Sequence, residues 1–481
     1  MPLPIFDWLA VVSFFYQQKL LASESQSKWK FLGLSPDGYL KPLGQVFNDT
    51  FPGPLIEACW GDTITIHVTN LEAKEGSTVH WHGIRQLGTN QMDGVNGVTQ
   101  CPIAQNGTFT YKFNVEQYGH TWYHSHYQVQ YSDGVMGPLS IYGPSSANYD
   151  EALEPIMMSD WVHDNASVSF LQELNGGIPV MDSLILGGNG QRYEVIVQAN
   201  PLPGHEAADG NYWIRTRVAA GCGNVVSHDE NTGILRYNAS STANPTTTAL
   251  TLRTECVDEQ PDNLVPVVPW TVKNLQGNIN DFTFEADLSN VKFEGGFFRW
   301  DLLDQPLFLN YSDPTILHAD NPSFRYNDSY CIVPYNFTQG FVYLVITGEN
   351  LNKIAKRPVP AAHPIHLHGH DFVILAQEDH PFNATTEVPK FKYDNPTRRD
   401  VALLYGGGYL ALAFKPDNPG VWLVHCHIAF HASSGLALQI LERQDEIIGS
   451  LGGAGALAGT KSGCEGWDKW NLQIDQDDSG I

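Results

Sequence analysis

The densest group of potential metal ligands lies at residues 425–431, where the sequence reads HCHIAFH. A cysteine stands between two histidines, and His431 follows four residues after His427. Successive side chains of a β-strand point to opposite faces. If this segment begins as a strand, Cys426 therefore points to one face while His425 and His427 point to the other. One segment could then serve two metal centres joined by only a few covalent bonds, as electron transfer requires.

Three further stretches carry histidine pairs. These are His80 and His82, His124 and His126, and His366 and His368, with His363 and His370 beside the last pair. Together with His425 and His427 they make four His-x-His pairs, or eight imidazoles. Eight divides into three, three and two, which is enough for a pair of ions with a third ion beside them. The remaining set, His363, Cys426 and His431, is typical of a blue-copper electron-transfer site.

These motifs are also compatible with a zinc site or a purely structural role. A lone His-x-His pair is more often a zinc ligand pair or a structural feature of a strand, and zinc can use both histidine and cysteine. Zinc favours a closed tetrahedral ligand set and needs no electron route between sites. Four pairs in this order, one with an embedded cysteine, favour copper. His67 lies in an alternating strand pattern and is expected to be structural.

The four motifs resemble those of multicopper oxidases, and their surroundings are similar to ascomycete fungal laccases. The similarity extends from about Pro36 to the last residue. It includes GPLIE at 53–57, WGD at 60–62, GIRQ at 83–86 and QYSDG at 130–134. The resemblance implies an all-β fold of three sequential cupredoxin-like β-sandwich (Greek-key) domains, the second apparently truncated. It also implies four copper ions, one of type 1, one of type 2 and two of type 3.

The resemblance implies a ligand set for each ion. His363, Cys426 and His431 would hold type 1 copper, and His80 and His366 would hold type 2 copper. The type 3 pair would be held by His82, His124, His126, His368, His425 and His427. The first and third domains would thus share the trinuclear site at their interface. His370 falls outside this pattern and is expected to be structural.

The implied activity is that of a laccase, which oxidises phenolic or aromatic substrates by one electron and reduces O₂ to water by four. Electrons would enter at the edge of His431 and pass through Cys426. Phe430 would form part of the substrate rim. Leu436, ten residues after Cys426, stands at the axial position of type 1 copper, where leucine cannot coordinate. Axial-ligand identity tunes the potential of such sites, so a high-potential centre is expected.

Three alternative functions stay open at this point. An ascorbate oxidase would share every copper ligand. A metallo-oxidase that takes electrons from Fe²⁺ would need carboxylates beside His431, and the motif regions show no such cluster. A copper-binding glycoprotein inactivated by its truncated second domain is the third alternative.

Two further residues are candidate catalytic residues by resemblance. Asp93 matches an acidic family residue that lies near the copper cluster and is thought to help deliver protons, although an aspartate before glycine is also common in turns. The C-terminal sequence DDSGI ends at Ile481 and resembles the C-terminal plug of ascomycete laccases. That plug enters a channel toward the trinuclear cluster. The alternative is an ordinary frayed terminus.

Length and composition set the wider limits. A chain of 481 residues is long enough for two or three domains. Short segments rich in aromatic and β-branched residues, separated by Gly and Pro, favour β-sandwiches. We expect domains at residues 28–145, 146–263 and 264–481, the last with the C-terminal plug. The net charge of −25 argues against nucleic-acid binding.

The second domain departs from the resemblance. FLQELN at 170–175 matches text early in this domain of the relatives, whereas DSLILG at 182–187 matches text much later. Only residues 176–181 lie between them. The missing part holds the carboxylate that accepts a phenol's proton in fungal laccases, and no residue here is assigned that role. Either an exon has been left out of this sequence or the domain is reduced.

Cysteines and glycosylation sequons bear on the compartment. The resemblance implies disulfides Cys101–Cys464 and Cys222–Cys256, and Cys59 and Cys331 are expected to be unpaired. Eight N-x-[S/T] sequons together predict a secreted glycoprotein. Residues 1–27 form a poor signal-like segment, whose apolar run is too short to span a bilayer. We expect a monomer that acts on a small phenolic or aromatic substrate and O₂, with no nucleic-acid or membrane partner.

Overall fold

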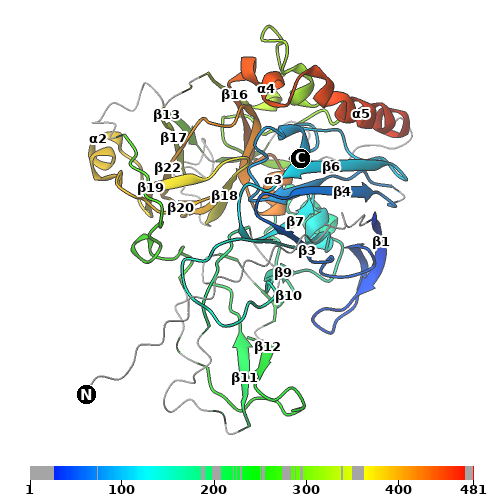
Figure 1. Cartoon of the computed structure of the whole chain (residues 1–481), viewed down its shortest axis with the longest axis vertical. Coiled ribbons are helices and arrows are strands. Elements are labelled where there is room, and N and C mark those ends of the chain that lie inside the picture. The colour runs from blue at the N-terminus through cyan, green and yellow to red at the C-terminus, as the bar shows by residue number, and fades with distance from the viewer. Residues whose placement is uncertain are drawn as a thin grey trace, which may run out of the picture.

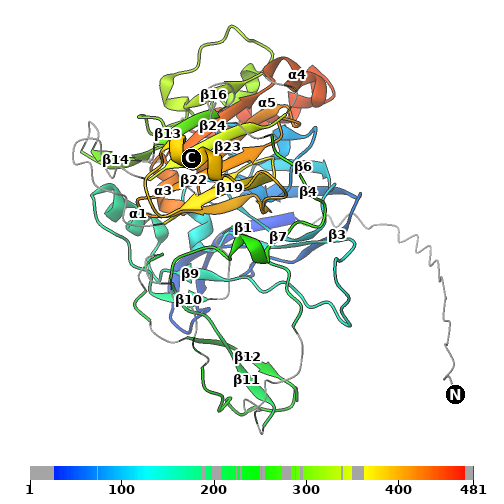
Figure 2. The same ribbon diagram turned by 90° about the vertical axis from the view of Figure 1, so that its left-hand side faces the viewer.

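The computed structural model consists mainly of β-strands. It describes residues 26–72, 74–185, 190–197, 207, 209–219, 222–223, 225–227, 230–249, 251, 255–273, 283–287, 289–292, 296–336, 338, 340–348, 362–471 and 480–481. Two β-sandwiches lie next to each other, one built from the N-terminal and one from the C-terminal part of the chain, and a hairpin of the middle region projects away from both (Figures 1 and 2). The signal-like residues 1–25 and the tail residues Asp478 and Ser479 lie outside the described part.

The first sandwich contains two four-stranded sheets. Its strands are β1 (Gln26–Leu34), β2 (Lys41–Phe47), β3 (Ile56–Cys59), β4 (Thr63–Thr69), β5 (Val79–His82), β6 (Thr108–Asn114), β7 (Gly119–Ser125) and β8 (Met136–Tyr142). The sheet orders are β2-β1-β4-β6 and β3-β8-β7-β5. In β4 every second residue is buried, namely Ile64, Ile66 and Val68, as expected for a strand with one face on the core. The alternating sequence of residues 63–68 and 108–115 predicts half-buried strands, and β4 and β6 confirm this prediction. His67 lies on the other face of β4, where its ring contacts Thr110.

The second sandwich contains two five-stranded sheets. Its strands are β13 (Thr283–Asp287), β16 (Ile332–Tyr335), β17 (Val342–Thr347), β18 (His363–Leu367), β19 (Phe372–Glu378), β20 (Arg398–Arg399), β21 (Val401–Leu404), β22 (Tyr409–Phe414), β23 (Gly420–Cys426) and β24 (Ala437–Glu442). The sheet orders are β13-β17-β22-β19-β20 and β16-β24-β23-β18-β21. β17, β22, β23 and β24 are buried along their whole length, which explains their continuous apolar runs. The apolar residues 344–346 and 372–375 predict strand cores, and β17 and β19 confirm this prediction.

The region between the sandwiches contains small sheets in its described part. Its elements are β9 (Ser159–Trp161), α1 (Ala166–Leu174), β10 (Ser183–Ile185), β11 (Asn211–Arg215) and β12 (Asn231–Arg236). β9 pairs with β10 and β11 pairs with β12, each pair forming a two-stranded sheet. Asn165 caps α1 by accepting a hydrogen bond from the Ser167 N–H at 3.0 Å. The assignment of residues 146–263 to a shortened sandwich domain stays a prediction.

The remaining elements are short. They are η1 (Asn90–Met92), η2 (Gln130–Asp133), η3 (Pro261–Asn263), β14 (Ser289–Lys292), β15 (Phe298–Asp301), η4 (Thr315–His318), η5 (Asp328–Tyr330), α2 (Ala384–Glu387), η6 (Val388–Lys390), α3 (Ala429–Ser433), α4 (Gln444–Ser450), η7 (Ala454–Leu457) and α5 (Ala458–Asn471). No helix in the described part of the chain is both long enough and apolar enough to cross a membrane.

The C-terminal helix α5 is fastened to the first sandwich. A disulfide joins Cys464 of α5 to Cys101, 363 residues earlier in the sequence, and Trp467 of α5 is fully buried. The second predicted disulfide, Cys222–Cys256, is also present, while Cys59 and Cys331 are free as expected. The Gly-rich composition of residues 451–459 predicts a surface loop. This prediction is wrong, because η7 and the start of α5 occupy most of the segment.

Candidate metal centres

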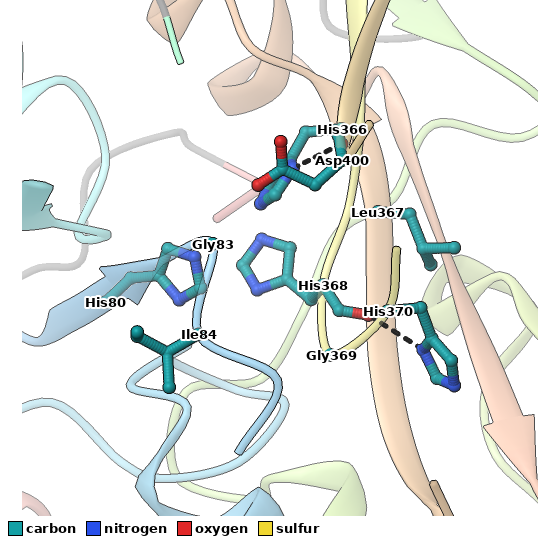
Figure 3. Close-up of a pocket in the computed structure, with 9 residues that line it drawn as sticks. All are labelled: His80, Gly83, Ile84, His366, Leu367, His368, Gly369, His370 and Asp400. Carbon is teal, nitrogen blue, oxygen red and sulfur yellow. Dashed lines mark hydrogen bonds between the residues drawn. The ribbon is translucent and has the colours of Figure 1, made fainter. Parts of the chain in front are cut away.

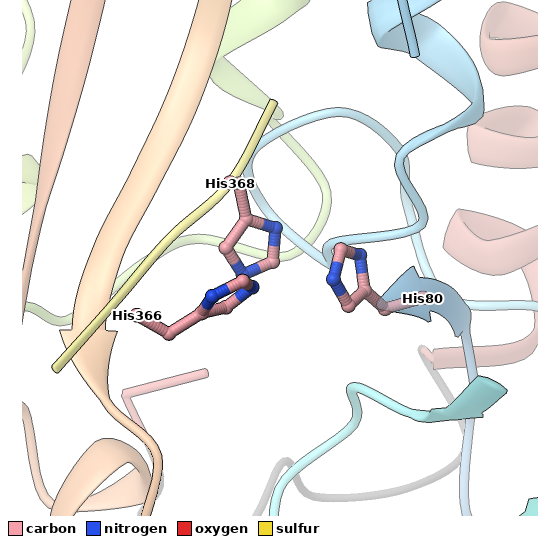
Figure 4. A group of neighbouring side chains, drawn as sticks. All are labelled: His80, His366 and His368. Carbon is pink, nitrogen blue, oxygen red and sulfur yellow. The ribbon is translucent and has the colours of Figure 1, made fainter. Parts of the chain in front are cut away.

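Four strands bring the histidine motifs together. β5 and β7 are neighbours in the first sandwich, with His80 opposite His124. β18 and β23 are neighbours in the second sandwich, with His366 opposite His425. The ends of these strands meet where the two sandwiches face each other, and Figure 4 shows His80 pointing from β5 toward His366 and His368. All ten histidines predicted as ligands, together with Cys426, lie in two clusters.

We call the smaller group, His363, Cys426 and His431, the cysteine cluster. The Cys426 Sγ atom lies 3.6 Å from the Nδ1 atoms of both His363 and His431. The two Nδ1 atoms are 3.1 Å apart. One sulfur and two nitrogens thus converge on one point, which is the donor set and trigonal arrangement that copper prefers in electron-transfer sites.

Burial controls the protonation of the cysteine cluster. Cys426 and His363 are fully buried, while the side chain of His431 is 15% exposed. Burial raises the pKa of the Cys426 thiol well above its usual range and lowers the pKa of His363 to about 3. Both imidazoles are therefore neutral and able to bind a metal. A bound cation would favour the thiolate by its own charge.

The other eight histidines form the histidine cluster, which consists of His80, His82, His124, His126, His366, His368, His425 and His427. Three sets of three within it, namely 80/366/368, 80/82/124 and 126/368/425, have nitrogens that lie within 4.8 Å of one another. His82 and His366 stack with ring centroids 4.1 Å apart, and His80 and His368 lie 4.0 Å apart. His427 Nε2 is 3.2 Å from His82 Nδ1. Three histidines per set would be an unusual density for a purely structural core.

Hydrogen bonds turn the free nitrogens of these rings inward. The Nδ1–H groups of His80 and His366 donate to the main-chain oxygens of Asp93 and Asp400, both at 2.8 Å. His124 and His425 donate in the same way to the carbonyls of their following residues. A carbonyl can only accept, so each of these rings has its lone pair on Nε2. Such outer contacts fix the tautomer of metal-binding histidines.

Four of the inward nitrogens have no protein partner. The buried Nε2 atoms of His80, His124, His126 and His366 make no hydrogen bond, although buried polar atoms are normally paired. Burial, and then the neighbouring imidazoles, lower the pKa of His126 and His366 well below their usual range. Neutral rings with unpartnered lone pairs that point at one another are the donors that copper ions require. The residues present therefore fit this metal.

Cys426 and its neighbours serve both clusters. The Cys426 side chain lies in the cysteine cluster, whereas His425 contacts His126 and His368 and His427 contacts His82 in the histidine cluster. This is the division between strand faces that alternation predicts. The two clusters are thus connected through the main chain of three consecutive residues.

Asp93 links the two sandwiches at the histidine cluster. Its side chain is fully buried. Its Oδ2 atom accepts the Nδ1–H of His368 at 2.9 Å, and its main-chain oxygen accepts that of His80. Asp93 is thus in direct contact with two of the predicted ligands, one from each sandwich.

Ile481 lies beside the histidine cluster on another side. It is 2% exposed, and its main-chain oxygen accepts the Gln128 N–H at 3.0 Å. A small cavity is lined by Ile481 together with His124, His126 and His425. The Gly480 N–H donates to the Ser433 carbonyl at 2.6 Å. The end of the chain is therefore held inside the molecule.

Glu173 and Trp300 at the exposed edge of His431 were not identified from the sequence. Glu173, on α1, places Oε2 3.9 Å from His431 Nε2, and its Oε1 accepts the Trp300 Nε1–H at 2.9 Å. Burial raises the pKa of Glu173 to about 7. The Trp300 ring lies 4.6 Å from the His431 ring. Neither residue has a local signal in the sequence, although Glu173 lies in the FLQELN segment already noted.

Three other residues near the clusters have clear positions. Phe430 is 5% exposed and packs with Phe170 and Leu174 of α1, so the expectation that it forms the substrate rim is wrong. Leu436 is fully buried in the main core. His370 lies outside both clusters, where its Nε2 meets the buried Glu442 carboxyl at 2.9 Å, as expected for a structural residue.

Comparisons with known proteins identify the family of the chain. Two multicopper oxidase family models match the chain, at residues 33–146 and 303–446. A laccase from Arthroderma benhamiae is 36% identical over 536 residues, covering 92% of this chain and 82% of that protein. Laccase-1 from Botryotinia fuckeliana is 38% identical, covering 93% and 87%. The alignment with the Arthroderma benhamiae laccase has 536 positions, which exceeds the 481 residues of the chain. The Arthroderma benhamiae laccase therefore has segments that the chain lacks.

The fold is also that of a known laccase. The crystal structure of the laccase from Botrytis aclada superposes with a TM-score of 0.84 and 36% sequence identity, covering 95% of this chain and 94% of that one. That match shows that the chain has the cupredoxin-like fold of multicopper oxidases. The chain belongs to the multicopper oxidase family, and it is a copper oxidoreductase of the laccase type.

Proposed function

We propose that the cysteine cluster holds type 1 copper and that the histidine cluster holds the type 2 ion and the type 3 pair. His80 and His366 would hold type 2 copper, and the other six histidines would hold type 3 copper. The observation that carries this proposal is the convergence of Cys426 Sγ with two imidazole Nδ1 atoms at 3.6 Å, directly beside eight mutually facing imidazoles.

The chain's own residues define the route of electrons. Bound copper would supply one-electron uptake at the first site and four-electron delivery to O₂ at the second. His431, whose side chain is 15% exposed, offers the edge at which a small phenol can make contact. The main chain from His425 to His427 gives a route of few bonds between the two sites. Asp93 keeps His80 and His368 oriented from opposite sides of the sandwich interface.

We propose small phenolic or aromatic compounds as the substrates, oxidised beside His431. Trp300 covers part of this site and offers an aromatic face for a phenol ring. The Glu173 carboxyl is the acidic group of this edge, at 3.9 Å from His431 Nε2. Within the described part of the chain, Glu173 is the carboxylate that lies within ion-pair distance of His431, whereas an Fe²⁺ site would require a group of carboxylates. This difference favours an organic reductant.

The C-terminus is proposed as a plug of the histidine cluster. Support comes from the burial of Ile481 and its hydrogen bond from Gln128, which lies two residues beyond His126. In this position the terminal residue limits access to the cluster from one side.

We further propose that the protein is secreted and glycosylated. All eight sequon asparagines are at least partly exposed; they are Asn48, Asn106, Asn165, Asn238, Asn310, Asn327, Asn336 and Asn383. The chain also has two disulfides, and disulfides persist mainly in oxidising compartments such as the extracellular space. A mass shift on enzymatic deglycosylation of protein from the culture medium is the expected result. Protein found only inside the cell would contradict this part.

Oxygen uptake tests the proposed activity. Copper-loaded protein should consume O₂ when a simple phenol is supplied, in a ratio of four phenols oxidised per O₂ and without release of hydrogen peroxide. Ferrous ion and ascorbate serve as competing reductants. Faster turnover with either of these than with every phenol tried would overturn the substrate assignment, and no uptake by fully loaded protein would overturn the activity.

A further inference from the structure

One short segment of the middle region contacts both sandwiches at the histidine cluster. The Glu194 carboxylate accepts the His120 N–H of β7 at 3.0 Å. The Tyr193 hydroxyl accepts a hydrogen bond from Arg399 of β20 at 2.8 Å. Arg192 forms an ion pair at 2.7 Å with Asp400, which follows Arg399 in the sequence. Consecutive residues of the segment Gly190–Glu194 therefore bind the first and the second sandwich.

Asp400 connects this segment to the predicted ligands. Its main-chain oxygen accepts the Nδ1–H of His366 at 2.8 Å, as Figure 3 shows. Its Oδ2 atom lies 3.6 Å from His82 Nε2. The Asp400 residue is only 5% exposed, so the position of its carboxylate depends on its protein partners.

Arg192 supplies the cation that faces this carboxylate. The Nη1 group donates to Asp400 Oδ1 at 2.7 Å and to the Gly190 main-chain oxygen at 2.8 Å. One guanidinium nitrogen of Arg192 thus connects the Asp400 carboxylate to the main chain at Gly190. The Arg192 side chain is 27% exposed, so solvent weakens its Coulombic attraction to Asp400. We therefore expect the two directed hydrogen bonds to contribute more than the charge to the position of Asp400.

Two glycines allow this close approach. Gly190 has φ +87°, and a Cβ there would lie 3.3 Å from ring atoms of both His82 and His427. A Cβ at Gly83 would lie 2.5 Å from Arg192 Nη2. The backbone of one glycine therefore packs on two imidazoles, while the other glycine leaves room for the guanidinium. A larger residue at either position would push the segment away from the cluster.

We propose that Arg192 is a positioning residue of the trinuclear copper site. It holds the Asp400 carboxylate beside His82, steadies the Asp400 carbonyl on which the His366 tautomer depends, and keeps Gly190 packed over His82 and His427. The inference rests on the copper assignment of the histidine cluster. It gives the middle region, despite its small sheets, a defined role in the metal site. Changes in such outer contacts typically reduce metal affinity or activity about 10- to 100-fold.

The test compares copper retention in the full-length holoprotein. Arg192→Ala should lose trinuclear copper to a chelator about 10- to 100-fold more readily than the wild type, seen as loss of the type 2 EPR signal and of copper by metal analysis. The blue absorption of the cysteine cluster should persist. Arg192→Lys, which retains the charge with a different geometry, should recover part of the retention. Arg217→Ala is the matched control, because Arg217 binds Glu230 at 2.5 Å in the same region, away from the clusters.

Each outcome has a defined meaning. Wild-type retention in Arg192→Ala, or equal loss of blue and trinuclear copper with a lowered melting temperature, would overturn the positioning role. If Arg192→Ala did not fold, Arg192→Gln would carry the same test, because it removes the guanidinium and its charge while keeping a polar side chain at this partly exposed position. The double variant Arg192→Ala/Asp400→Asn should retain copper no worse than the poorer single variant if Arg192 acts through Asp400. A wild type that binds no blue copper would instead contradict the proposed function.

Discussion

The Asp93 carboxylate accepts a hydrogen bond from His368 at 2.9 Å across the sandwich interface, although 275 residues separate them in the sequence. This contact fixes the ring of one predicted type 3 ligand from the opposite sandwich. Asp93 thereby helps to hold the two halves of the histidine cluster in register.

Replacing Asp93 tests this relationship. Asp93→Ala removes the acceptor of the His368 Nδ1–H, so oxygen turnover should fall about 10- to 100-fold. Asp93→Asn keeps an acceptor of the same shape. The copper content of this variant should therefore fall less than that of Asp93→Ala. The rate at which a phenol bleaches the blue band under anaerobic conditions should stay close to wild type, because it reports on the cysteine cluster alone. Stopped-flow absorption and oxygen electrode measurements separate the two steps, and equal loss in both would contradict this role.

The C-terminus gives a second prediction. Deleting Asp478 to Ile481, or extending the chain beyond Ile481, should lower oxygen reduction more than it changes the blue absorption, because Ile481 lies beside His124, His126 and His425. The comparison is made at matched copper content. Unchanged turnover together with unchanged thermal stability would show that the end of the chain has no part in the reaction.

The buried ion pair of Lys41 and Asp133 predicts a large effect on stability. Lys41 Nζ lies 2.7 Å from Asp133 Oδ1, and both side chains are almost fully buried. Lys41→Met would leave the carboxylate with the Ala166 N–H as a donor but without its counter-ion, and breaking a buried pair in this way costs about 3–5 kcal/mol of unfolding free energy. Lys41→Met/Asp133→Leu should recover much of the loss. Lys390→Met, at a lysine whose side chain is 66% exposed, is the control and should cost about 1 kcal/mol or less.

The same pair predicts the pH dependence of this loss. Burial raises the pKa of Asp133 to about 6, from a usual value of 3.8, even with Lys41 present. The folded state thus holds the proton more tightly than the unfolded state, and the contribution of this group to stability falls as pH rises from 3.8 through about 6. Without Lys41 the folded-state pKa is higher still. Lys41→Met should therefore be less destabilised at pH 5 than at pH 7 in denaturant titrations, and the reverse order would contradict the assignment.

The free cysteines should differ in reactivity. Cys59 is exposed, whereas Cys331 is buried and burial raises the pKa of its thiol to about 12. Because the thiolate is the reactive form, an alkylating reagent should label Cys59 in the native holoprotein and Cys331 only after unfolding. Peptide mass spectrometry identifies the labelled sites. Labelling of Cys331 in native protein, or a Cys59–Cys331 disulfide, would show that the two thiols are wrongly placed.

The sequence predicts well which histidines lie together, because the spacing within each motif is local. Alternation along β23 is enough to place Cys426 opposite its two neighbours, and the cross-strand partners follow from the same motif at 366–368. Arg192 could not be found in this way, because its contact with Asp400 spans 208 residues and depends on how the middle region packs. Local composition was also misleading at Gly455 and Gly459, where tertiary contacts of Trp467 and the Cys101–Cys464 bridge override the low helix propensity of glycine.

Copper content and visible absorption of the wild type and of Cys426→Ser test the central claim most directly. Two separate sites connected through Cys426 predict a wild type with four copper ions and a blue thiolate-to-copper band. Cys426→Ser should lose the band and the type 1 ion while keeping the type 2 EPR signal, and phenol-driven oxygen uptake should vanish. A colourless wild type that holds zinc after growth in copper, or a Cys426→Ser variant that stays blue, would contradict the assignment of the two clusters.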